Sequence, residues 1–356
     1  MRTMRHQPWA LVTVSLVMLA ILAAAPSSLA RTSELPASLN DREFWKLITD
    51  ASESGGYFRN ADLTNFTSNE MLYQHVLTDL QARAKPGGVY LGVGPEQNYT
   101  YMAALRPKMA IIFDIRRGNL DLQLMYKAIF ELSKDRAAFV SMLFSKPRSA
   151  GLGVNSSAAE IFGAFGSSAT SEALYTANRA AITTALAQTH AFPLAEHNDQ
   201  AGINAVYEMF YRSGFALRAS PTYADLMTAT DERGTPRSFL ASEAAYQWLR
   251  DLEMHNLVVP VVGDFGGPKA IRAVGQYLKS GGAVVSAFYL SNVEQYLVQD
   301  GKWEAFCRSV ATLPLDASST FIRSASGGMS GGFGRGGGFV SSLGNMASEV
   351  KTCSAK

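Results

Sequence analysis

Two glycines and one acid form the clearest chemical pattern in this sequence. Gly92 and Gly94 end the apolar run "VYLGVG", and Asp114 ends a second apolar run, "KMAIIFDI", twenty residues after Gly94. Glycine has no Cβ, so a ligand can approach the backbone closely at such a turn. An acid at the end of the following strand is placed to accept hydrogen bonds from ribose hydroxyls. The pattern predicts a site for a nucleoside-type small molecule; the alternative is that the glycines only permit the turn and Asp114 caps a helix.

Glu96 follows the glycines, at the point where a phosphate would meet the start of the next helix. A carboxylate at this position would repel a pyrophosphate, so a ligand with a neutral or cationic group is favoured over a dinucleotide. We therefore count Glu96, with Gly92, Gly94 and Asp114, among the candidate cofactor-binding residues.

Two residues further along the chain are candidate catalytic groups. Asp264 ends the apolar stretch "VVPVVGDF", and Tyr289 lies at the end of "AVVSAFYL". Asp264 is the only carboxylate that we expect at this rim with the placement of a general base. Its alternative role is to cap the helix predicted over "PKAIRAVGQYL", because aspartate is a common N-cap.

Two pairs of residues match the capping-box pattern, in which a Ser or Thr is followed three residues later by Glu. Thr67 and Glu70 stand at the start of a predicted helix over residues 68–84. Ser291 and Glu294 stand at the start of the helical stretch that follows the last predicted strand. For all four residues the pattern favours a structural role at a helix start.

Apolar runs of strand length alternate with helical segments along much of the chain, which indicates a parallel sheet with helices on both faces. The rules of crossover handedness then predict an α/β fold with a doubly wound Rossmann-like sheet. The carboxyl ends of its strands would bring the candidate residues to one opening. The predicted organisation is a signal peptide (1–30), an N-terminal extension (31–66), the Rossmann-like domain (67–323) with a helical insertion around 145–250, and a mobile, low-complexity Gly-rich tail (324–356).

The first thirty residues have the pattern of a secretory signal. Arg2 and Arg5 precede a long apolar segment, and Ser28-Leu29-Ala30 offers small residues for cleavage after Ala30. We expect an exported protein, periplasmic or secreted; the alternative is anchoring to the inner membrane by residues 9–25, the one membrane contact that the sequence suggests. The two cysteines permit one disulfide in an oxidising compartment but do not require it.

The charge balance argues against a nucleic-acid partner. The formal net charge of +2 falls to zero without the signal, and 17% of the residues are charged, compared with about 25% in typical domains. Such a chain lacks the basic surface that binds phosphate backbones. His190 and His197 match no metal-ligand spacing, so we expect no metal and a small-molecule ligand as partner.

Four stretches together resemble the pattern of class I S-adenosylmethionine-dependent methyltransferases: "VYLGVGPEQN", "AIIFDIRRGN", "VVGDFGG" and "YLKSGGAVVSAFYL". In that family a glycine-rich loop contacts the cofactor, an acid after the second strand binds the ribose, an acid or polar residue after the fourth strand faces the methyl group, and a turn like "KSGG" precedes the fifth strand. The resemblance implies that Gly92, Gly94 and Asp114 hold S-adenosylmethionine and that Asp264 faces the reacting group.

From about Phe44 to Arg323 the chain looks like an uncharacterised bacterial family that is grouped as methyltransferase-like. Tyr90 stands where that pattern has an acid, and Glu96 where it has a third glycine. S-adenosylmethionine is made in the cytoplasm, whereas this chain carries an export signal. Two hypotheses follow. One is an exported protein that binds a nucleoside-type molecule and transfers a methyl group. The other is a catalytically silent binding or envelope-associated protein that keeps the fold without the cofactor.

Overall fold

The computed structural model describes residues 34–56, 65–326 and 339–353. The predicted signal peptide lies outside these residues, so its cleavage stays a prediction. Within the described ranges, none of the helices combines the length and the apolar character needed to cross a membrane.

The centre of the structure is a six-stranded sheet with the order β3-β2-β1-β4-β5-β6. All neighbouring strands pair in parallel except β6, which is antiparallel to β5. After β1 the chain adds β2 and β3 on one side and then returns to add β4 and β5 on the other. This is the doubly wound, Rossmann-like arrangement, so the predicted α/β fold class is confirmed. The strands are Val89–Val93 (β1), Met109–Asp114 (β2), Val258–Val262 (β3), Val285–Ser291 (β4), Thr320–Ser326 (β5) and Phe339–Asn345 (β6).

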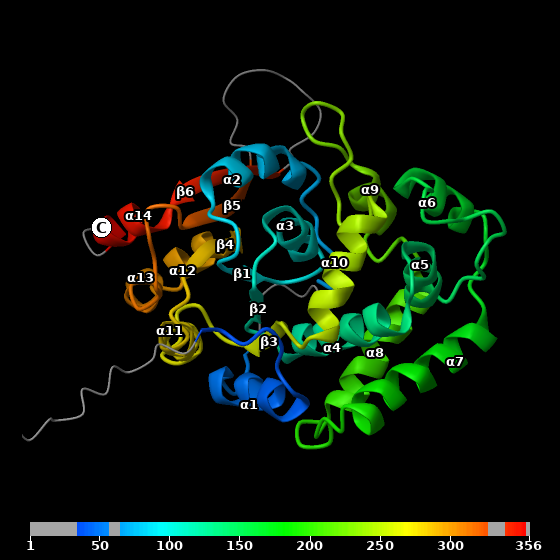
Figure 1. The fold of residues 1–356 in the computed structure, drawn as a ribbon, viewed down its shortest axis with the longest axis horizontal. Coiled ribbons are helices and arrows are strands. Elements are labelled where there is room, and N and C mark those ends of the chain that lie inside the picture. The colour runs from blue at the N-terminus through cyan, green and yellow to red at the C-terminus, as the bar shows by residue number, and fades with distance from the viewer. Residues whose placement is uncertain (1–33, 57–64, 327–338, 354–356) are drawn as a thin grey trace, which may run out of the picture. The chain divides into compact units, whose positions relative to one another are not determined.

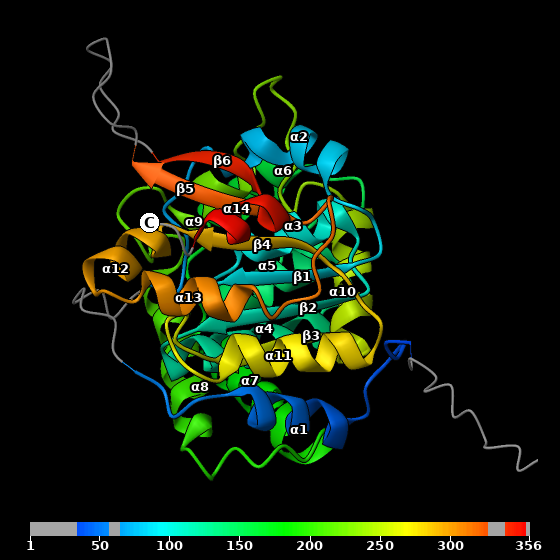
Figure 2. The same cartoon turned by 90° about the vertical axis from the view of Figure 1, so that its left-hand side faces the viewer.

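The inner strands form where the sequence has short, uninterrupted apolar runs. Every residue of β2 and β3 is buried, as expected for strands that are covered on both faces. Helices α3, α4 and α10 lie on one face of the sheet, and α11 and α13 lie on the other (Figures 1 and 2). The main helices of these layers are Gln97–Leu105 (α3), Arg117–Leu132 (α4), Glu243–Met254 (α10), Ala270–Ser280 (α11), Val293–Gln299 (α12) and Trp303–Val310 (α13).

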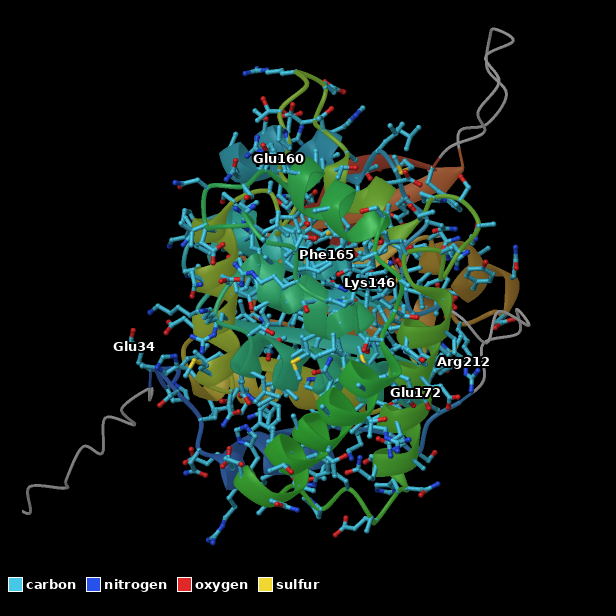
Figure 3. The ribbon with its side chains drawn as sticks, turned by 90° about the vertical axis from the view of Figure 1, so that its right-hand side faces the viewer. Glu34, Lys146, Glu160, Phe165, Glu172 and Arg212 are labelled. Atoms are coloured by element: carbon cyan, nitrogen blue, oxygen red, sulfur yellow. A yellow bond between two sulfur atoms is a disulfide. The ribbon has the colours of Figure 1, made fainter. Side chains whose placement is uncertain are left out.

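The helical insertion forms a further layer outside α4, which contacts α8 along its length (Figures 1 and 3). Lys146 helps to join its parts, because its buried ammonium donates to the carbonyl oxygen of Phe165 at 3.0 Å (Figure 3). Burial lowers the pKa of Lys146. The helices of this layer are Arg136–Phe144 (α5), Ala158–Gly166 (α6), Glu172–Thr183 (α7), Thr184–Thr189 (η2), Asp199–Ser213 (α8) and Tyr223–Thr228 (α9).

The segment predicted as an N-terminal extension is integrated into the fold. Its helix α1 (Asp41–Ala51) begins with a capping box formed by Asn40 and Glu43 and packs against β3 and α11. Further on, Glu53 accepts hydrogen bonds from the backbone amides of Lys269 and Ala270 at 2.9 and 3.1 Å. Glu53 therefore satisfies free N–H groups at the start of α11, a role that the sequence analysis assigned to Asp264 as one alternative.

The prediction of a mobile tail over residues 324–356 is wrong for residues 339–353. Phe339–Asn345 pairs with β5 along its whole length, and Met346–Cys353 forms α14. The prediction weighed the glycine content of the whole segment, whereas this part has side chains to bury: Met346 is fully buried. Residues 327–338, which hold the longest glycine run, lie outside the described residues.

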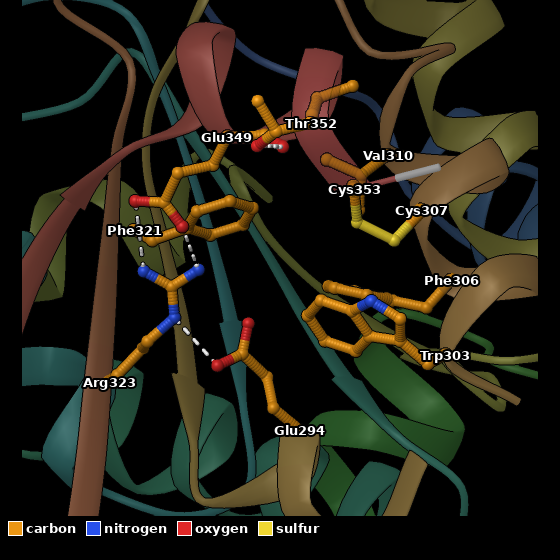
Figure 4. A pocket seen from close by; sticks show the side chains of 11 residues that line it. Glu294, Trp303, Phe306, Cys307, Val310, Phe321, Arg323, Glu349, Thr352 and Cys353 are labelled. Carbon is orange, nitrogen blue, oxygen red and sulfur yellow. Dashed lines mark hydrogen bonds and ion pairs between the residues drawn. A yellow bond between two sulfur atoms is a disulfide. The ribbon is translucent and has the colours of Figure 1, made fainter. Parts of the chain in front are cut away.

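An ion-pair group and a disulfide attach α14 to the rest of the chain (Figure 4). Arg323 on β5 lies between two carboxylates and donates to Glu294 at 2.7 Å and to Glu349 at 2.6 Å. Cys307 on α13 is bonded to Cys353, so the disulfide that the sequence permitted is formed. These groups line a small cavity of about 110 Å³.

We predict that Cys353→Ser lowers the free energy of unfolding by about 2–4 kcal/mol, because the disulfide closes a loop between residues 46 positions apart. Urea unfolding with and without dithiothreitol measures this change. The reductant should lower the unfolding midpoint of the wild type and leave that of the variant unchanged. A wild-type midpoint that is insensitive to reductant would contradict the role assigned to this bond.

Candidate functional site

A cavity of about 620 Å³ opens at the carboxyl ends of β1, β2, β3 and β4. Its volume is in the range of small-molecule sites, about 300–1,000 Å³. It lies where the strand order reverses, between β1 and β4, which is the usual place for a ligand in an open parallel sheet. The lining residues lie in segments 65–70, 93–95, 114–116, 263–265 and 289–302, together with Arg218.

Gly94 is at the opening, as the sequence predicted. Its φ of +78° is a left-handed conformation that favours glycine, and a Cβ added there would meet no atom within 4 Å. A ligand can therefore approach the backbone at this turn. The carbonyl oxygen of Gly94 accepts a hydrogen bond from Gln123 on α4 at 3.0 Å, which fixes the turn to the helical layer.

Gly92 does not line the cavity. A Cβ at Gly92 would lie 1.9 Å from Oδ1 of Asn98, so the glycine makes room for that side chain. Asn98 accepts a hydrogen bond from Tyr90 at 2.9 Å and donates to the carbonyl oxygens of Val93 and Pro95 at 3.0 and 2.7 Å. Gly92 and Tyr90 thus shape the turn from inside.

Asp114 lines the cavity at the end of β2, beside the turn at Gly94. Its carboxylate already binds its neighbour Arg116. Oδ1 accepts from the Arg116 backbone amide at 2.9 Å and from Nε at 3.1 Å, and Oδ2 accepts from Nη2 at 3.0 Å. Arg116 therefore brings a guanidinium group into the cavity wall, although no sequence motif singles this residue out.

Asp264 reaches the same cavity, but from the edge strand β3 rather than from a strand beside β1. The resemblance places it after the fourth strand; in the structure Tyr289 and Ser291, at the end of β4, and Asn292, directly after it, hold that position. Asp264 forms a salt bridge with Lys302 and accepts a hydrogen bond from the backbone amide of Gly266. Its carboxylate is thus engaged by a cation, which disfavours a role as general base.

Glu96 is fully buried and does not line the cavity. It points toward the loop before η1 (Tyr73–Val76), where it accepts hydrogen bonds from the Thr67 hydroxyl at 3.0 Å and the Ser68 amide at 3.1 Å. Burial raises the pKa of Glu96 to about 7. The expected contact between Glu96 and a cofactor is therefore replaced by an indirect role, since Glu96 holds a loop that forms one wall of the cavity.

Both predicted capping boxes are wrong, and two of the four residues, Glu70 and Ser291, line the cavity instead. Glu70 is buried and lines the cavity, where it accepts hydrogen bonds from Tyr289 at 2.8 Å and Ser291 at 2.5 Å. Thr67 donates to Glu96, and Glu294 pairs with Arg323. The capping pattern describes only local spacing, whereas these side chains find partners far away in the sequence.

Tyr289 lies at the rim, as predicted, with its ring 5.1 Å from that of Tyr101. Burial raises the pKa of Tyr289 well above its ordinary value, and the neighbouring Glu70 adds to this effect. Tyr289 therefore acts as a neutral hydrogen-bond donor to Glu70.

Arg218, from the helical insertion, adds a second guanidinium group to the wall. It donates to the backbone carbonyl of Thr67 at 3.2 Å and to Oδ1 of Asn65 at 3.0 Å. No local pattern around Arg218 distinguishes it in the sequence. Among the residues that the structure describes, no group of three or more His, Cys, Asp and Glu side chains is arranged to hold a metal ion.

The fold and the cavity define a Rossmann-like α/β protein with an opening at the carboxyl rim of a doubly wound sheet. The chain belongs to the family described as "Domain of unknown function (DUF7790)", whose model matches residues 65–336. That range includes every segment that lines the cavity.

No curated protein matches this chain. Among solved structures, the rRNA methyltransferase aviRa from Streptomyces viridochromogenes is similar with 13% sequence identity and a TM-score of 0.32, covering 83% of this chain and 96% of that chain. A similarity of this size does not bear on what the present chain does.

We predict that the wild-type protein loses stability between pH 4.5 and 7 more steeply than a Glu96→Gln variant. The pKa of Glu96 is about 7 in the folded chain, compared with an ordinary value of 4.5. The folded state therefore holds the proton more tightly. The contribution of the protonated Glu96 side chain to the free energy of unfolding is complete below pH 4.5 and is lost as the pH rises through 7.

Urea unfolding of both proteins across pH 4.5–8 measures this difference. Burial raises the pKa of Asp121 and of Glu253 to about 8. Both groups remain in the variant, so the difference between the two profiles isolates Glu96. If the free energies of unfolding of the wild type and the variant change with pH in parallel, the pKa of Glu96 is not raised in the folded chain.

Proposed function

We propose that this protein binds a nucleoside-type small molecule in the cavity at the carboxyl rim. The observation that carries the proposal is the placement of Asp114, at the end of β2 and beside the open backbone of Gly94. Oδ2 of Asp114 accepts one hydrogen bond, from Arg116. A carboxylate oxygen has two lone pairs, so Oδ2 can accept a second bond from a ribose hydroxyl.

S-adenosylmethionine is the nucleoside-type ligand that the sequence resemblance suggests, and the residues present are compatible with it. Gly94 leaves the backbone open, Asp114 has a free acceptor position, and the cavity is large enough to take a ligand of this size. When bound, S-adenosylmethionine supplies a methyl group for transfer to a nucleophile. This chain's own part would be to align the two reactants.

The first of the two hypotheses that the sequence left open includes both ligand binding and methyl transfer. The second is a catalytically silent binding or envelope-associated protein that keeps the fold without S-adenosylmethionine. The Asp264 carboxylate is already engaged by Lys302. No other observation assigns a base at the rim, so we limit the proposal to binding. A catalytically silent binding protein and a methyltransferase would both satisfy it.

We further propose that the protein is exported. The first thirty residues support this proposal by their signal pattern. The Cys307–Cys353 disulfide supports it independently, because disulfides persist mainly in oxidising compartments.

We predict that the wild type binds adenosine at least about tenfold more tightly than adenine, because only adenosine has hydroxyls for Asp114. The Asp114→Asn variant should lose most of this preference. Isothermal titration calorimetry measures both affinities, with S-adenosylmethionine and S-adenosylhomocysteine as further ligands. Asp251→Asn on the exposed side of α10 is the matched control and should behave like the wild type. A wild type that binds none of the four ligands would refute the proposal.

Cell fractionation with mass spectrometry of the amino terminus tests export. We predict a mature chain that begins at Arg31 in the periplasmic or secreted fraction. An intact chain in the membrane fraction would show the anchored alternative by residues 9–25. An intact chain in the cytoplasmic fraction would contradict export.

A further inference from the structure

Glu70 is a buried carboxylate at the cavity, and its hydrogen-bond partners are all neutral. Only 2% of the residue is exposed, and it lines the opening beneath β4. Oε1 accepts from the hydroxyls of Tyr289 and Ser291, and Oε2 accepts from Nε2 of Gln97 at 2.8 Å. Within the described part of the chain, no lysine, arginine or histidine forms a salt bridge with it.

The cationic groups in the cavity wall have other partners. Arg116 binds Asp114, and Lys302 binds Asp264. Arg218 donates to Asn65 and Thr67. Asp114 and Asp264 thus each form a salt bridge with a cationic side chain, whereas Glu70 forms none with the residues that the structure describes.

A buried carboxylate is costly unless a positive charge or strong donors compensate it. Three neutral donors satisfy part of the hydrogen-bonding capacity of Glu70 but leave its charge in place. Two acceptor positions on Oε1 and one on Oε2 are already filled, so little capacity remains for a ligand that would bind through several N–H donors. A cation that needs no hydrogen bond matches this environment better.

Aromatic rings line the same cavity. Tyr289, Tyr296 and Phe265 all contribute to its wall. The faces of such rings attract cations, and they make close contacts with the methyl groups of sulfonium or quaternary ammonium centres. A carboxylate that contacts one of these rings, Tyr289, and shares a cavity with the other two is therefore suited to a methylated cation.

We propose that Glu70 forms an anionic subsite for an onium centre, either a sulfonium or a quaternary ammonium group, carried by the ligand of this cavity. The inference rests on the proposed function in that it places the cation on the same ligand that Asp114 binds. Gln97, Tyr289 and Ser291 hold the carboxylate in place, and Glu70 itself contacts the ligand. The contact with Glu70 requires a positive charge on the ligand, whereas the contact between Asp114 and a ribose hydroxyl does not.

A pair of ligands that differ by one methyl group and one charge tests the subsite. S-adenosylmethionine has a sulfonium, whereas S-adenosylhomocysteine has a neutral thioether. Calorimetry with the wild type should show at least about tenfold tighter binding of S-adenosylmethionine, the size expected for one charge contact in a partly buried site. Equal affinities for the two ligands would overturn the proposal.

Substitutions at Glu70 assign the preference to this residue. Glu70→Gln should reduce the ratio of the two affinities to within about threefold while leaving the affinity for adenosine unchanged. Glu70→Asp keeps the charge and should retain part of the preference, which guards against a variant that fails to fold. Glu304→Gln, an exposed carboxylate on α13 outside the cavity, is the control and should keep the wild-type ratio. A ratio that survives in Glu70→Gln would also overturn the proposal.

A second pair of ligands separates this inference from the nucleoside proposal. Choline and 3,3-dimethylbutan-1-ol have nearly the same shape, but only choline is charged. If no nucleoside binds, tighter binding of choline than of the alcohol, lost in Glu70→Gln, would support the subsite although the nucleoside proposal fails. If adenosine binds but neither pair shows a charge preference, the subsite is refuted and the nucleoside proposal stands. If no ligand binds, both are refuted.

Discussion

The candidate site depends on the position of β1 in the sheet. β1 pairs in parallel with β2 on one side and with β4 on the other, so the carboxyl ends of all three strands meet at one rim. The chain moves outward from β1 in both directions, and the helices that follow β1 and β4 therefore diverge and leave an opening. Asp114 comes to this opening from β2 and Tyr289 from β4. Without this reversal of strand order, residues separated by more than 170 positions would not line one cavity.

A connected series of buried polar groups fixes the glycine turn to the helical layers. Gln123 donates to the Gly94 carbonyl and accepts a hydrogen bond from Tyr99 at 2.9 Å. The Tyr99 hydroxyl also lies 3.2 Å from the Glu253 carboxyl. The Tyr99 hydroxyl is the donor to this carboxyl as it is to Gln123, and burial raises the pKa of Glu253 to about 8. Lys127 donates in turn to the Glu253 carbonyl oxygen. The helices α3, α4 and α10 thereby share in positioning the turn that faces the cavity.

The sequence predicted the parts of the fold that follow from local apolar patterns. The runs that became β1 to β4 are uninterrupted and bounded by turn residues, and the rule that carboxyl ends of parallel strands meet at one edge placed Gly94, Asp114, Asp264 and Tyr289 together. β6 was missed because its sequence, "FVSSLGN", contains few apolar residues and follows a glycine-rich segment.

The remaining site residues could not be predicted from local spacing. Glu70 has the sequence signature of a helix cap, and only the return of β4 beside β1 brings Tyr289 and Ser291 to it. Arg218 comes from the helical insertion, whose packing against the rim depends on contacts between distant helices. Glu96 was expected to face the ligand because it follows the glycine turn at the start of a helix, but it binds Thr67 and Ser68, which are far away in the sequence. In each case the error lies in a long-range contact that a local pattern does not encode.

The most direct test of the account is a crystal structure of the protein with adenosine or S-adenosylhomocysteine bound at saturating concentration. We expect density for the nucleoside in the cavity at the carboxyl rim, with a ribose hydroxyl within about 3 Å of the Asp114 carboxylate. A nucleoside bound elsewhere, or one bound in the cavity with its ribose away from Asp114, would contradict it.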